Sequence, residues 1–326
     1  MIHVVMTPVR NEAWVLRAFL EATSRWADYI IIADQMSTDG SREIALQYDK
    51  VVLIDNNNPE FNEPERQAML ITKAREIAAG RDTLLWGLDA DEVLDASFQD
   101  TDDWRRIIHS VPGDVIWFKW AEICPDKKHY WLSPVTYYPW LFHDDGAEPH
   151  GNYVRNMHSM RIPYPIEEKQ LHYVDDFRVL HLAYLNPNRT QAKRRFYSFV
   201  DWEMNHRSPV ILSRSYAQTK RDDLVFELSD KMIHSQTYCD LDILSLVDTS
   251  ETKFWFDDYV TTHLGKYSNK KTRKLPIWDK SLLKNYSLDD PRTILDKLVH
   301  FYLESTQRNN AIIRRGIDKL LKFFYK

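Results

Sequence analysis

Three acidic residues stand close together in the segment Leu88-Asp89-Ala90-Asp91-Glu92. Carboxylates spaced this closely repel one another, and a divalent cation would relieve the repulsion. Mg²⁺ and Mn²⁺ both bind carboxylate oxygens together with phosphate oxygens. The segment, which contains a DxD motif, therefore predicts a metal site that also holds a diphosphate. The alternative is a solvated acidic turn at the start of a helix.

A second polar segment runs from Asp34 to Ser41, directly after an apolar run. A carboxylate at the end of a strand can accept a hydrogen bond from a nucleotide base or a ribose hydroxyl, as the acid of dinucleotide-binding folds does. Residues 37–39 are Ser, Thr and Asp, which cap helices well, and Gly40 suits a turn. We expect Asp34 to face a ligand and the residues after it to shape the loop.

The pattern of apolar residues predicts the elements that position these segments. Short buried strands are expected at residues 2–6, 29–33, 51–54 and 83–88, with helices between them at 12–25, 41–48 and 65–79. Strands that alternate with helices predict a parallel sheet covered on both faces. Ligands bind outside the carboxyl ends of such strands, where this chain has polar residues at 7–11, 34–40, 55–58 and 89–92.

Three segments in this order and spacing resemble family 2 glycosyltransferases of the GT-A fold. They are Thr7-Pro8-Val9-Arg10-Asn11-Glu12, Asp34-Gln35-Met36-Ser37-Thr38-Asp39-Gly40-Ser41 and Leu88-Asp89-Ala90-Asp91-Glu92. The resemblance covers residues 1–95 well and extends weakly to residue 200. It implies an α/β fold of the GT-A, Rossmann-like type, with a mostly parallel sheet flanked by helices. It also implies an inverting transferase that uses a nucleotide-diphosphate sugar and Mn²⁺ or Mg²⁺.

The resemblance implies roles in nucleotide binding for several residues. It places Asp34 at the base or the ribose and Arg66 near the diphosphate. The second acid seen after Asp34 in many members is Gln35 here. The remaining residues expected to contact the nucleotide follow the first predicted strand: Thr7, Pro8, Val9 and Asn11.

The resemblance also implies a set of metal ligands. Asp91 would bind the metal directly, and Asp89 would reach the ribose, or the metal through a water. His181, in the apolar stretch Val179-Leu180-His181-Leu182, looks like the histidine that supplies a later ligand in this fold. A single histidine in an apolar stretch is equally typical of a core residue, so both interpretations stay open.

An inverting transfer needs a base that takes the proton of the acceptor hydroxyl. Relatives often have an acid after the histidine in the stretch that resembles Asn156-Met157-His158-Ser159, where this chain has Ser159. Asp144 or Asp145 is the expected substitute, with Glu148 nearby, although an exposed acidic loop is the alternative for each. His158 stays open as a base or as a phosphate contact.

We expect residues 1–210 to form the nucleotide-sugar-binding and catalytic domain, and residues 211–326 to form a helical C-terminal region for acceptor, membrane or oligomer contacts. Aromatic residues between 117 and 140 would stack on sugars or fill the core. The basic run 270–274 would hold an anionic group or lie in solvent. Residues 311–326 are apolar on one side and basic on the other, which suits an anionic bilayer, the chain's own domain or a second subunit.

The composition limits the classes of partner. Among 326 residues, 43 Lys and Arg face 48 Asp and Glu, a formal net charge of −5, which argues against a dedicated nucleic-acid binder. The two cysteines cannot form a disulfide framework, and no signal peptide is visible. We therefore expect a cytoplasmic protein, peripheral at the inner face of the membrane if its last helix lies on lipid.

The sequence thus predicts a metal-assisted hexosyltransferase of polysaccharide biosynthesis. It would move a sugar from a UDP-sugar to a hydroxyl of a glycan or lipid-linked acceptor. A nucleotidyltransferase on the same scaffold is one rival, but residues 7–12 lack the glycine of a phosphate-binding loop. A non-catalytic binding or scaffold protein is the other: Ser159 favours it, and the intact Asp89 and Asp91 argue against it.

Overall fold

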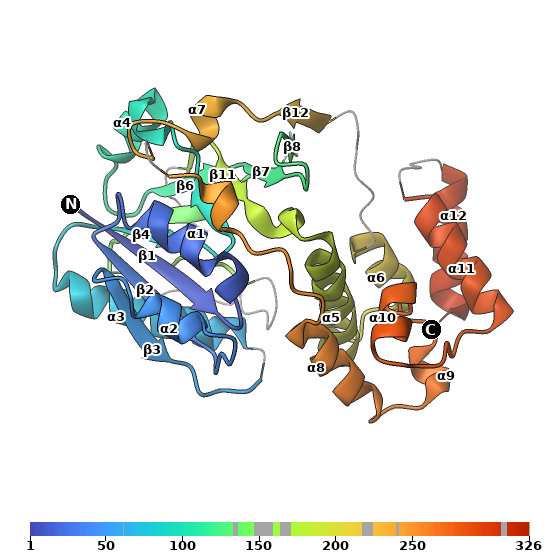
Figure 1. Ribbon diagram of the computed structural model, residues 1–326. Helices are drawn as coiled ribbons and strands as arrows, with labels where there is room; N and C mark the ends of the chain where they lie inside the picture. Colours follow the sequence, from blue (N-terminus) through green and yellow to red (C-terminus); the bar gives the residue numbers. More distant parts are fainter. Residues whose placement is uncertain are drawn as a thin grey trace. The chain divides into compact units, whose positions relative to one another are not determined.

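A computed structural model describes residues 1–60, 62–132, 136–146, 159–163, 171–216, 224–238, 241–307 and 312–325. The chain forms two compact units (Figure 1). Unit 1 comprises Met1–Leu185 and Asp222–Thr249, and unit 2 comprises Asn186–Arg221 and Ser250–Lys326. The division therefore falls earlier than residue 210, and a later segment of the chain returns to unit 1.

Unit 1 begins with the predicted alternation of strands and helices. Its first four large-sheet strands are parallel, in the spatial order β3-β2-β1-β4. The strands are β1 (Ile2–Val9), β2 (Tyr29–Asp34), β3 (Val51–Asp55) and β4 (Thr83–Gly87), and the helices between them are α1 (Ala13–Thr23), α2 (Ser41–Ala45) and α3 (Glu63–Ala78). The predicted existence, type and order of these elements are confirmed.

The expectation of a mostly parallel sheet is wrong for the sheet as a whole. Strand β9 (Tyr138–His143) pairs antiparallel with both β4 and β6 (Val115–Phe118), and β10 (Leu171–Tyr173) extends the sheet beyond β6. The result is a mixed sheet of seven strands among the described residues. Apolar periodicity predicts that a segment is a strand but not its direction, so β9 could not be oriented from the sequence.

A second, smaller sheet in unit 1 continues from the acidic segment. Its described strands follow the order β12-β8-β7-β11-β5. They are β5 (Glu92–Leu94), β7 (Trp120–Ile123), β8 (His129–Leu132), β11 (Val179–His181) and β12 (Val225–Glu227). In this register His181 stands opposite Glu92 on one side and Glu122 on the other. Residues opposite one another share a face of a sheet, so the pairing puts one imidazole between two acids.

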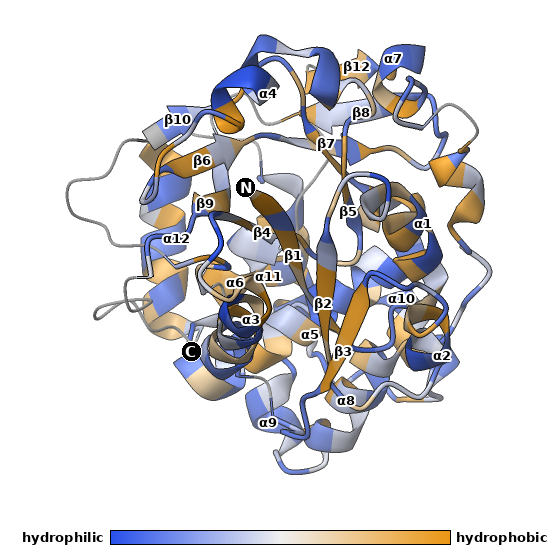
Figure 2. Ribbon diagram, turned by 90° about the vertical axis from the view of Figure 1, so that its left-hand side faces the viewer, coloured by the Kyte–Doolittle hydropathy of each residue, from blue (hydrophilic) through white to orange (hydrophobic). Residues whose placement is uncertain are grey.

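The core of unit 1 lies on both faces of the large sheet. Successive side chains of a strand point to opposite faces. Val5 accordingly packs in the cluster that contains the buried face of α1, whereas Val4 packs with Leu70 of α3. The apolar character of β1 and β3 is visible in Figure 2. A sheet packed on both faces holds its carboxyl-end edge rigidly, which is what a ligand site at that edge requires.

Unit 2 is helical and is organised around a buried ion-pair network. Helix α5 (Pro187–Asn205) begins where the Asn186 side chain accepts a hydrogen bond from the Arg189 backbone. Arg195 on this helix donates to both carboxylate oxygens of Asp257 at 2.7 Å. Its remaining Nη1 lies 2.6 Å from Asp279 Oδ2. The network joins α5 to α8 (Trp255–Leu264) and to the start of α10 (Lys280–Asn285).

Removing the cation from this network should destabilise unit 2 strongly. We expect Arg195→Met to lower the free energy of unfolding by about 3–5 kcal/mol, because the charge on Asp257 would stay buried without a partner. Urea unfolding followed by circular dichroism measures the loss. The matched control is Arg105→Met, whose ion pair with Asp102 is exposed, and it should cost less than about 1 kcal/mol. Equal losses in the two variants would contradict the assignment.

Candidate functional site

The carboxyl ends of β1, β2 and β3 bring two acids and one arginine together. Asp34, the last residue of β2, stands opposite Val9 and Asp55. Arg42 bridges the two acids, 2.9 Å from Asp34 Oδ2 and 2.8 Å from Asp55 Oδ1. The side chain of Asp34 is 1% exposed, and its Oδ1 has no hydrogen-bond partner among the described residues. A buried acceptor without a donor is costly, so this oxygen marks a place for a ligand N–H or O–H.

Two loops at this edge are joined by side-chain hydrogen bonds. The Asn11 backbone N–H donates to Ser37 Oγ at 2.9 Å, and Asn11 Oδ1 accepts from the Thr38 backbone at 2.8 Å. Ser41 Oγ likewise accepts from the Glu12 backbone. Asn11 and Met36 both have positive φ, which is uncommon outside glycine and occurs often at functional sites. The residues after Asp34 therefore shape the loop as expected, and Asn11 contributes to it as well.

The other residues expected to contact the nucleotide lie along the same edge. Thr7 and Val9 on β1 are buried, Pro8 is partly buried, and Thr7 Oγ1 has no hydrogen-bond partner in the described part of the chain. Gln35 stands where many family 2 glycosyltransferases have a second acid. Its side chain donates to the carbonyls of Asn58 and Glu60. Gln35 thus holds the loop after β3.

Arg66 and Ser159 are connected through one acid. Arg66 Nη2 lies 3.9 Å from Glu63 Oε1 in the first turns of α3. The other oxygen of Glu63 accepts a hydrogen bond from the Ser159 backbone at 2.7 Å. The segment that contains Ser159 is therefore held beside the start of α3, the helix on which the resemblance places a diphosphate contact.

The acidic segment after β4 is compensated by Arg161. Its guanidinium lies 2.6 Å from Asp89 Oδ2 and 2.5 Å from Glu92 Oε2. Arg161 reaches this position because Gly87 has no side chain. A Cβ at position 87 would lie 2.7 Å from the Arg161 Cβ. The sequence did not identify Arg161, whose only signal is a single cation in an apolar, proline-containing stretch.

His181 stands between the two remaining acids. Its Nδ1 lies 2.7 Å from Glu122 Oε2, and its Nε2 lies 3.5 Å from Asp91 Oδ2. The imidazole stacks on the ring of Trp120, with centroids 4.7 Å apart. Trp120 is one of the aromatic residues expected to stack on sugars or fill the core, and here it stacks on His181. Glu122 was not predicted, although an acid within the aromatic and apolar strand at 120–123 was a signal that could have identified it.

The pKa values of Glu92 and His181 are both raised, but for different reasons. Burial raises the pKa of Glu92 to about 7, against the opposing effect of Arg161. Burial alone would lower the pKa of His181, but the carboxylates of Glu122 and Asp91 outweigh it and raise that pKa well above its ordinary value. The imidazole therefore carries a proton when no competing cation is bound.

The donor set suits a divalent cation held by two side chains. Asp91 and His181 offer a carboxylate oxygen and an imidazole nitrogen, which Mn²⁺ accepts. Glu122, bound to the far ring nitrogen, fixes the orientation of His181 as an outer-shell carboxylate does. Within the described residues no cluster of three metal-ligating side chains exists, and Asp89 lies on Arg161 instead. The structure therefore brings together two of the three expected ligands and leaves the remaining positions to a ligand's oxygens.

Asp144, one of the two expected bases, lies at the wrong edge of the sheet. Because β9 runs antiparallel to β4, its last residue, His143, stands opposite Leu84, near the start of β4. The Asp144 backbone donates to the Thr83 carbonyl, and its carboxylate forms a two-point ion pair with Arg75. Asp144 is therefore held at the edge opposite the carboxyl-end crevice, which contradicts its prediction as the base. The alternatives Glu148 and His158 lie outside the described residues.

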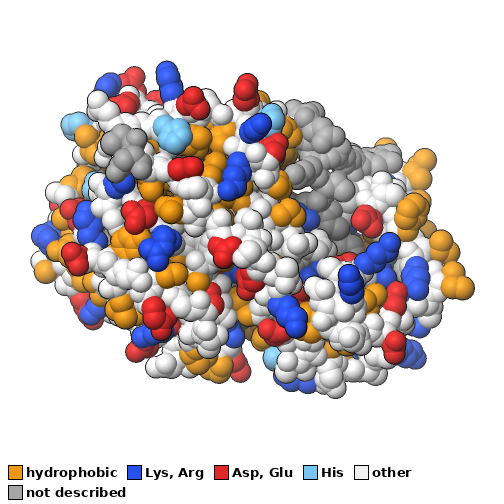
Figure 3. All heavy atoms as spheres, in the orientation of Figure 1, with side chains coloured by type: hydrophobic (Ala, Val, Ile, Leu, Met, Phe, Trp, Pro, Cys, Tyr) orange, Lys and Arg blue, Asp and Glu red, His pale blue; other side chains and the backbone are white. Residues whose placement is uncertain are grey.

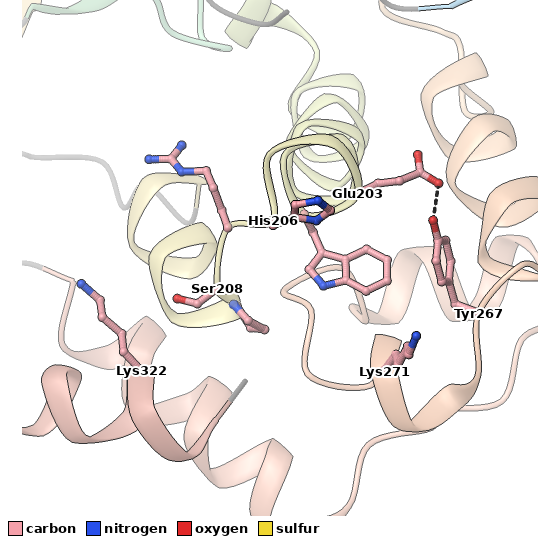
Figure 4. A pocket seen from close by; sticks show the side chains of 9 residues that line it. Glu203, His206, Ser208, Tyr267, Lys271 and Lys322 are labelled. Carbon is pink, nitrogen blue, oxygen red and sulfur yellow. Dashed lines mark hydrogen bonds between the residues drawn. The ribbon is translucent and has the colours of Figure 1, made fainter. Parts of the chain in front are cut away.

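Unit 2 contains a separate hollow of about 620 Å³ (Figure 4). Lys271 of α9 (Asn269–Thr272) and Lys322 of α12 (Ile312–Phe324) lie on opposite sides of it. Tyr267 donates to Glu203 at 2.8 Å and packs edge-on against Trp202. Because lysines and aromatic rings line the hollow, it could hold an anionic group that has an apolar face. It contains none of the residues expected to bind the nucleotide or the metal.

Comparisons with known proteins give only weak likenesses. No protein-family model and no curated protein matches the chain. Among solved structures, HddC from Yersinia pseudotuberculosis matches at a TM-score of 0.26 and 11% identity, over 44% of this chain and 74% of HddC. Galactosyltransferase LgtC, in complex with donor and acceptor sugar analogs, matches at 0.21 and 13% identity, over 44% of this chain and 58% of LgtC. The chain thus spans less than two thirds of LgtC. TM-scores this low do not show a common fold, so the resemblance to family 2 glycosyltransferases stays a prediction.

The role of Arg161 as the counter-charge of the buried Glu92 is testable through pH. The folded pKa of Glu92, about 7, lies above its ordinary value of 4.5, so its contribution to stability is present at low pH and is lost as the pH rises toward 7. Removing Arg161 raises that pKa further. We therefore expect Arg161→Met to cost about 3–5 kcal/mol at pH 8 and clearly less at pH 6, where Glu92 takes up a proton.

Urea unfolding in the presence of EDTA at both pH values measures this difference. Arg161→Lys keeps the charge and is the control, with a smaller loss that changes little with pH. The same loss for Arg161→Met at pH 6 and pH 8 would contradict the charge-compensation account.

Proposed function

We propose that the chain is an inverting glycosyltransferase that moves a sugar from a UDP-sugar to a hydroxyl of a glycan or lipid-linked acceptor. One observation carries the proposal. Asp34, with an unpartnered carboxylate oxygen, ends β2, and Asp91, which lies 3.5 Å from His181, follows β4. These two strands are the parallel neighbours of β1 on its two sides. That edge is where open α/β sheets bind nucleotides.

The nucleotide would lie across the ends of β1 and β2. Uracil offers a ring N–H, which would donate to Asp34 Oδ1, and Thr7, Pro8 and Val9 would line the base. Asp89, with 30% of its side chain exposed, stays available to a ribose hydroxyl. Arg66 would lie toward the diphosphate.

Mn²⁺ or Mg²⁺ would be held by Asp91 and His181. When bound, the cation offsets the charge that develops on the departing diphosphate. His181 would hold the cation as a neutral imidazole, oriented by the contact between its Nδ1 and Glu122. Since Asp144 pairs with Arg75 at the opposite edge, we propose His158 as the base for the acceptor hydroxyl, with Asp145 and Glu148 as alternatives.

A non-catalytic binding protein on the same fold is the second candidate. Arg161 already neutralises Asp89 with a charge of its own, as a fold that had lost its metal would need. Ser159, where relatives often carry an acid, favours the same interpretation. Both candidates bind a nucleotide at the same edge, so only chemistry distinguishes them.

The nucleotide site predicts metal-dependent stabilisation. With UDP at 100 times its dissociation constant, binding stabilises the fold by about 2.7 kcal/mol, a shift of several degrees in the melting temperature. We expect this shift with Mn²⁺ and a much smaller one without it, in a thermal-shift titration of UDP, GDP and CMP. Asp91→Asn should abolish the part that depends on Mn²⁺.

The variants give this titration its controls. Asp34→Asn should weaken UDP with and without Mn²⁺, because it removes the carboxylate that accepts from the base. Asp144→Asn, at the opposite edge, should leave the UDP shift unchanged. A titration in which no nucleotide stabilises the protein with either metal would sink the proposal.

Slow hydrolysis of the donor distinguishes the enzyme from the binding protein. The enzyme should release UDP from a UDP-sugar over hours without an acceptor, and Asp91→Asn should reduce the rate by about a hundredfold or more. Chromatography of the nucleotide products measures the release across a panel of UDP-sugars. Binding of UDP and Mn²⁺ without any hydrolysis or transfer would favour the binding protein.

A further inference from the structure

The last two helices of unit 2 expose a large apolar surface. Helix α11 (Ile294–Ser305) and helix α12 together present ten large apolar side chains that are 39–86% exposed. We call this the α11–α12 face, and its members are Ile294, Leu295, Leu298, Phe301, Ile312, Ile313, Ile317, Leu320, Phe323 and Phe324. Figure 3 shows apolar side chains along the right-hand edge of the molecule, with Lys and Arg beside them.

Helix α12 packs on unit 2 through a narrow side that holds Asp318 and Leu321, with Tyr325 directly after the helix. Its buried residue is Asp318, which pairs with Arg214 of α6 (Pro209–Tyr216) at 2.8 and 3.0 Å. Arg214 also donates to the Leu303 carbonyl on α11 at 2.6 Å. An amphipathic helix of a globular protein normally buries its apolar side. Here the ion pair fixes α12 the other way round, with the apolar side outward.

Helix α11 likewise packs on unit 2 through one side and exposes apolar residues on the other. It buries Val299 and Leu303 against Val210 of α6. Ile294, Leu298 and Phe301 lie on its other side and are 61–81% exposed. Both helices are therefore held by contacts to α6, and their remaining apolar residues are left for a partner.

An apolar surface of this extent marks an interaction site. Exposed apolar residues that are scattered need no explanation, whereas a contiguous patch indicates a protein or membrane contact. In each helix the exposed residues recur at spacings of three and four, so they form one stripe per helix. The stripes cannot cross a bilayer: the helices have 12 and 13 residues, about 20 Å, against about 30 Å of hydrocarbon. In the described parts of the chain, no helix is long and apolar enough to span a membrane.

The charged residues beside the apolar stripes indicate which kind of partner covers them. Arg315 and Lys319 are exposed and lie one turn from Ile312 and Phe323. Lys297 is exposed on α11 but pairs with Asp290 at 3.2 Å. Cations that flank an apolar stripe are attracted to anionic lipid head groups. A second copy docked by a two-fold axis would present the same mostly basic patch, and so would offer these cations less negative charge than an anionic bilayer does. The charges therefore favour an anionic bilayer over a dimer.

We propose that the α11–α12 face docks the protein on an anionic lipid bilayer. The apolar side chains enter the boundary between head groups and acyl chains, and Arg315 and Lys319 contact the head groups. This inference goes beyond the proposed function, since it rests on unit 2 alone and needs neither the nucleotide nor the metal.

Vesicle flotation tests the proposal with the full chain. We expect binding to vesicles of phosphatidylcholine mixed with phosphatidylglycerol, weak binding to phosphatidylcholine alone, and weakening by salt. The double variant Ile313→Glu, Leu320→Glu should reduce binding by roughly tenfold or more, and so should Arg315→Glu, Lys319→Glu. All four positions are exposed, so both variants should melt like the wild type.

Leu46→Glu is the matched control, because Leu46 is an exposed leucine of unit 1, at 70%. It should bind vesicles like the wild type. Absence of binding to the anionic vesicles would overturn the proposal. So would a dimer, seen by analytical ultracentrifugation without lipid, that the double apolar variant dissociates while vesicle binding is unaffected.

Discussion

Four carboxylates are crowded where the acidic segment enters the small sheet, and their mutual repulsion has to be compensated within a largely buried space. Arg161 pairs with Asp89 and Glu92, while His181 lies between Asp91 and Glu122. With all four acids ionised, one guanidinium and one protonated imidazole leave two negative charges. Two features of unit 1 produce this arrangement. The register of β5, β11 and β7 places His181 between the acids, and the absence of a side chain at Gly87 lets Arg161 approach.

The excess negative charge around His181 and the missing hydrogen bond at Asp34 can both be satisfied by one ligand together with its metal ion. A divalent cation would take the place of the proton on His181, and a nucleotide base would supply the donor that Asp34 Oδ1 lacks. Both positions follow parallel strands of the same rigid sheet. A nucleoside diphosphate has a neutral base at one end and a metal-binding diphosphate at the other, which is why this class of ligand fits both.

The sequence predicted the elements better than the contacts. The first four strands of the large sheet were predictable because both faces are covered, so that each strand is a nearly unbroken apolar run. Asp144 was misplaced because the direction of β9 depends on pairing partners distant in the chain. Arg161 and Glu122 were missed for a related reason: their roles come from strand register and from the close approach permitted at Gly87, which no local spacing encodes. Helix α12 was predicted to be amphipathic, but only the Arg214–Asp318 pair reveals which side faces outward.

The most direct test of the central claim is a manganese anomalous difference map from crystals grown with UDP and Mn²⁺. We expect one strong peak within bonding distance of Asp91 and of His181 Nε2, with the diphosphate on its open side and the uracil beside Asp34. Arg161 should still pair with Glu92. A peak that lies on Asp89 and Glu92 after displacement of Arg161, or a nucleotide bound away from the ends of β1 and β2, would contradict it.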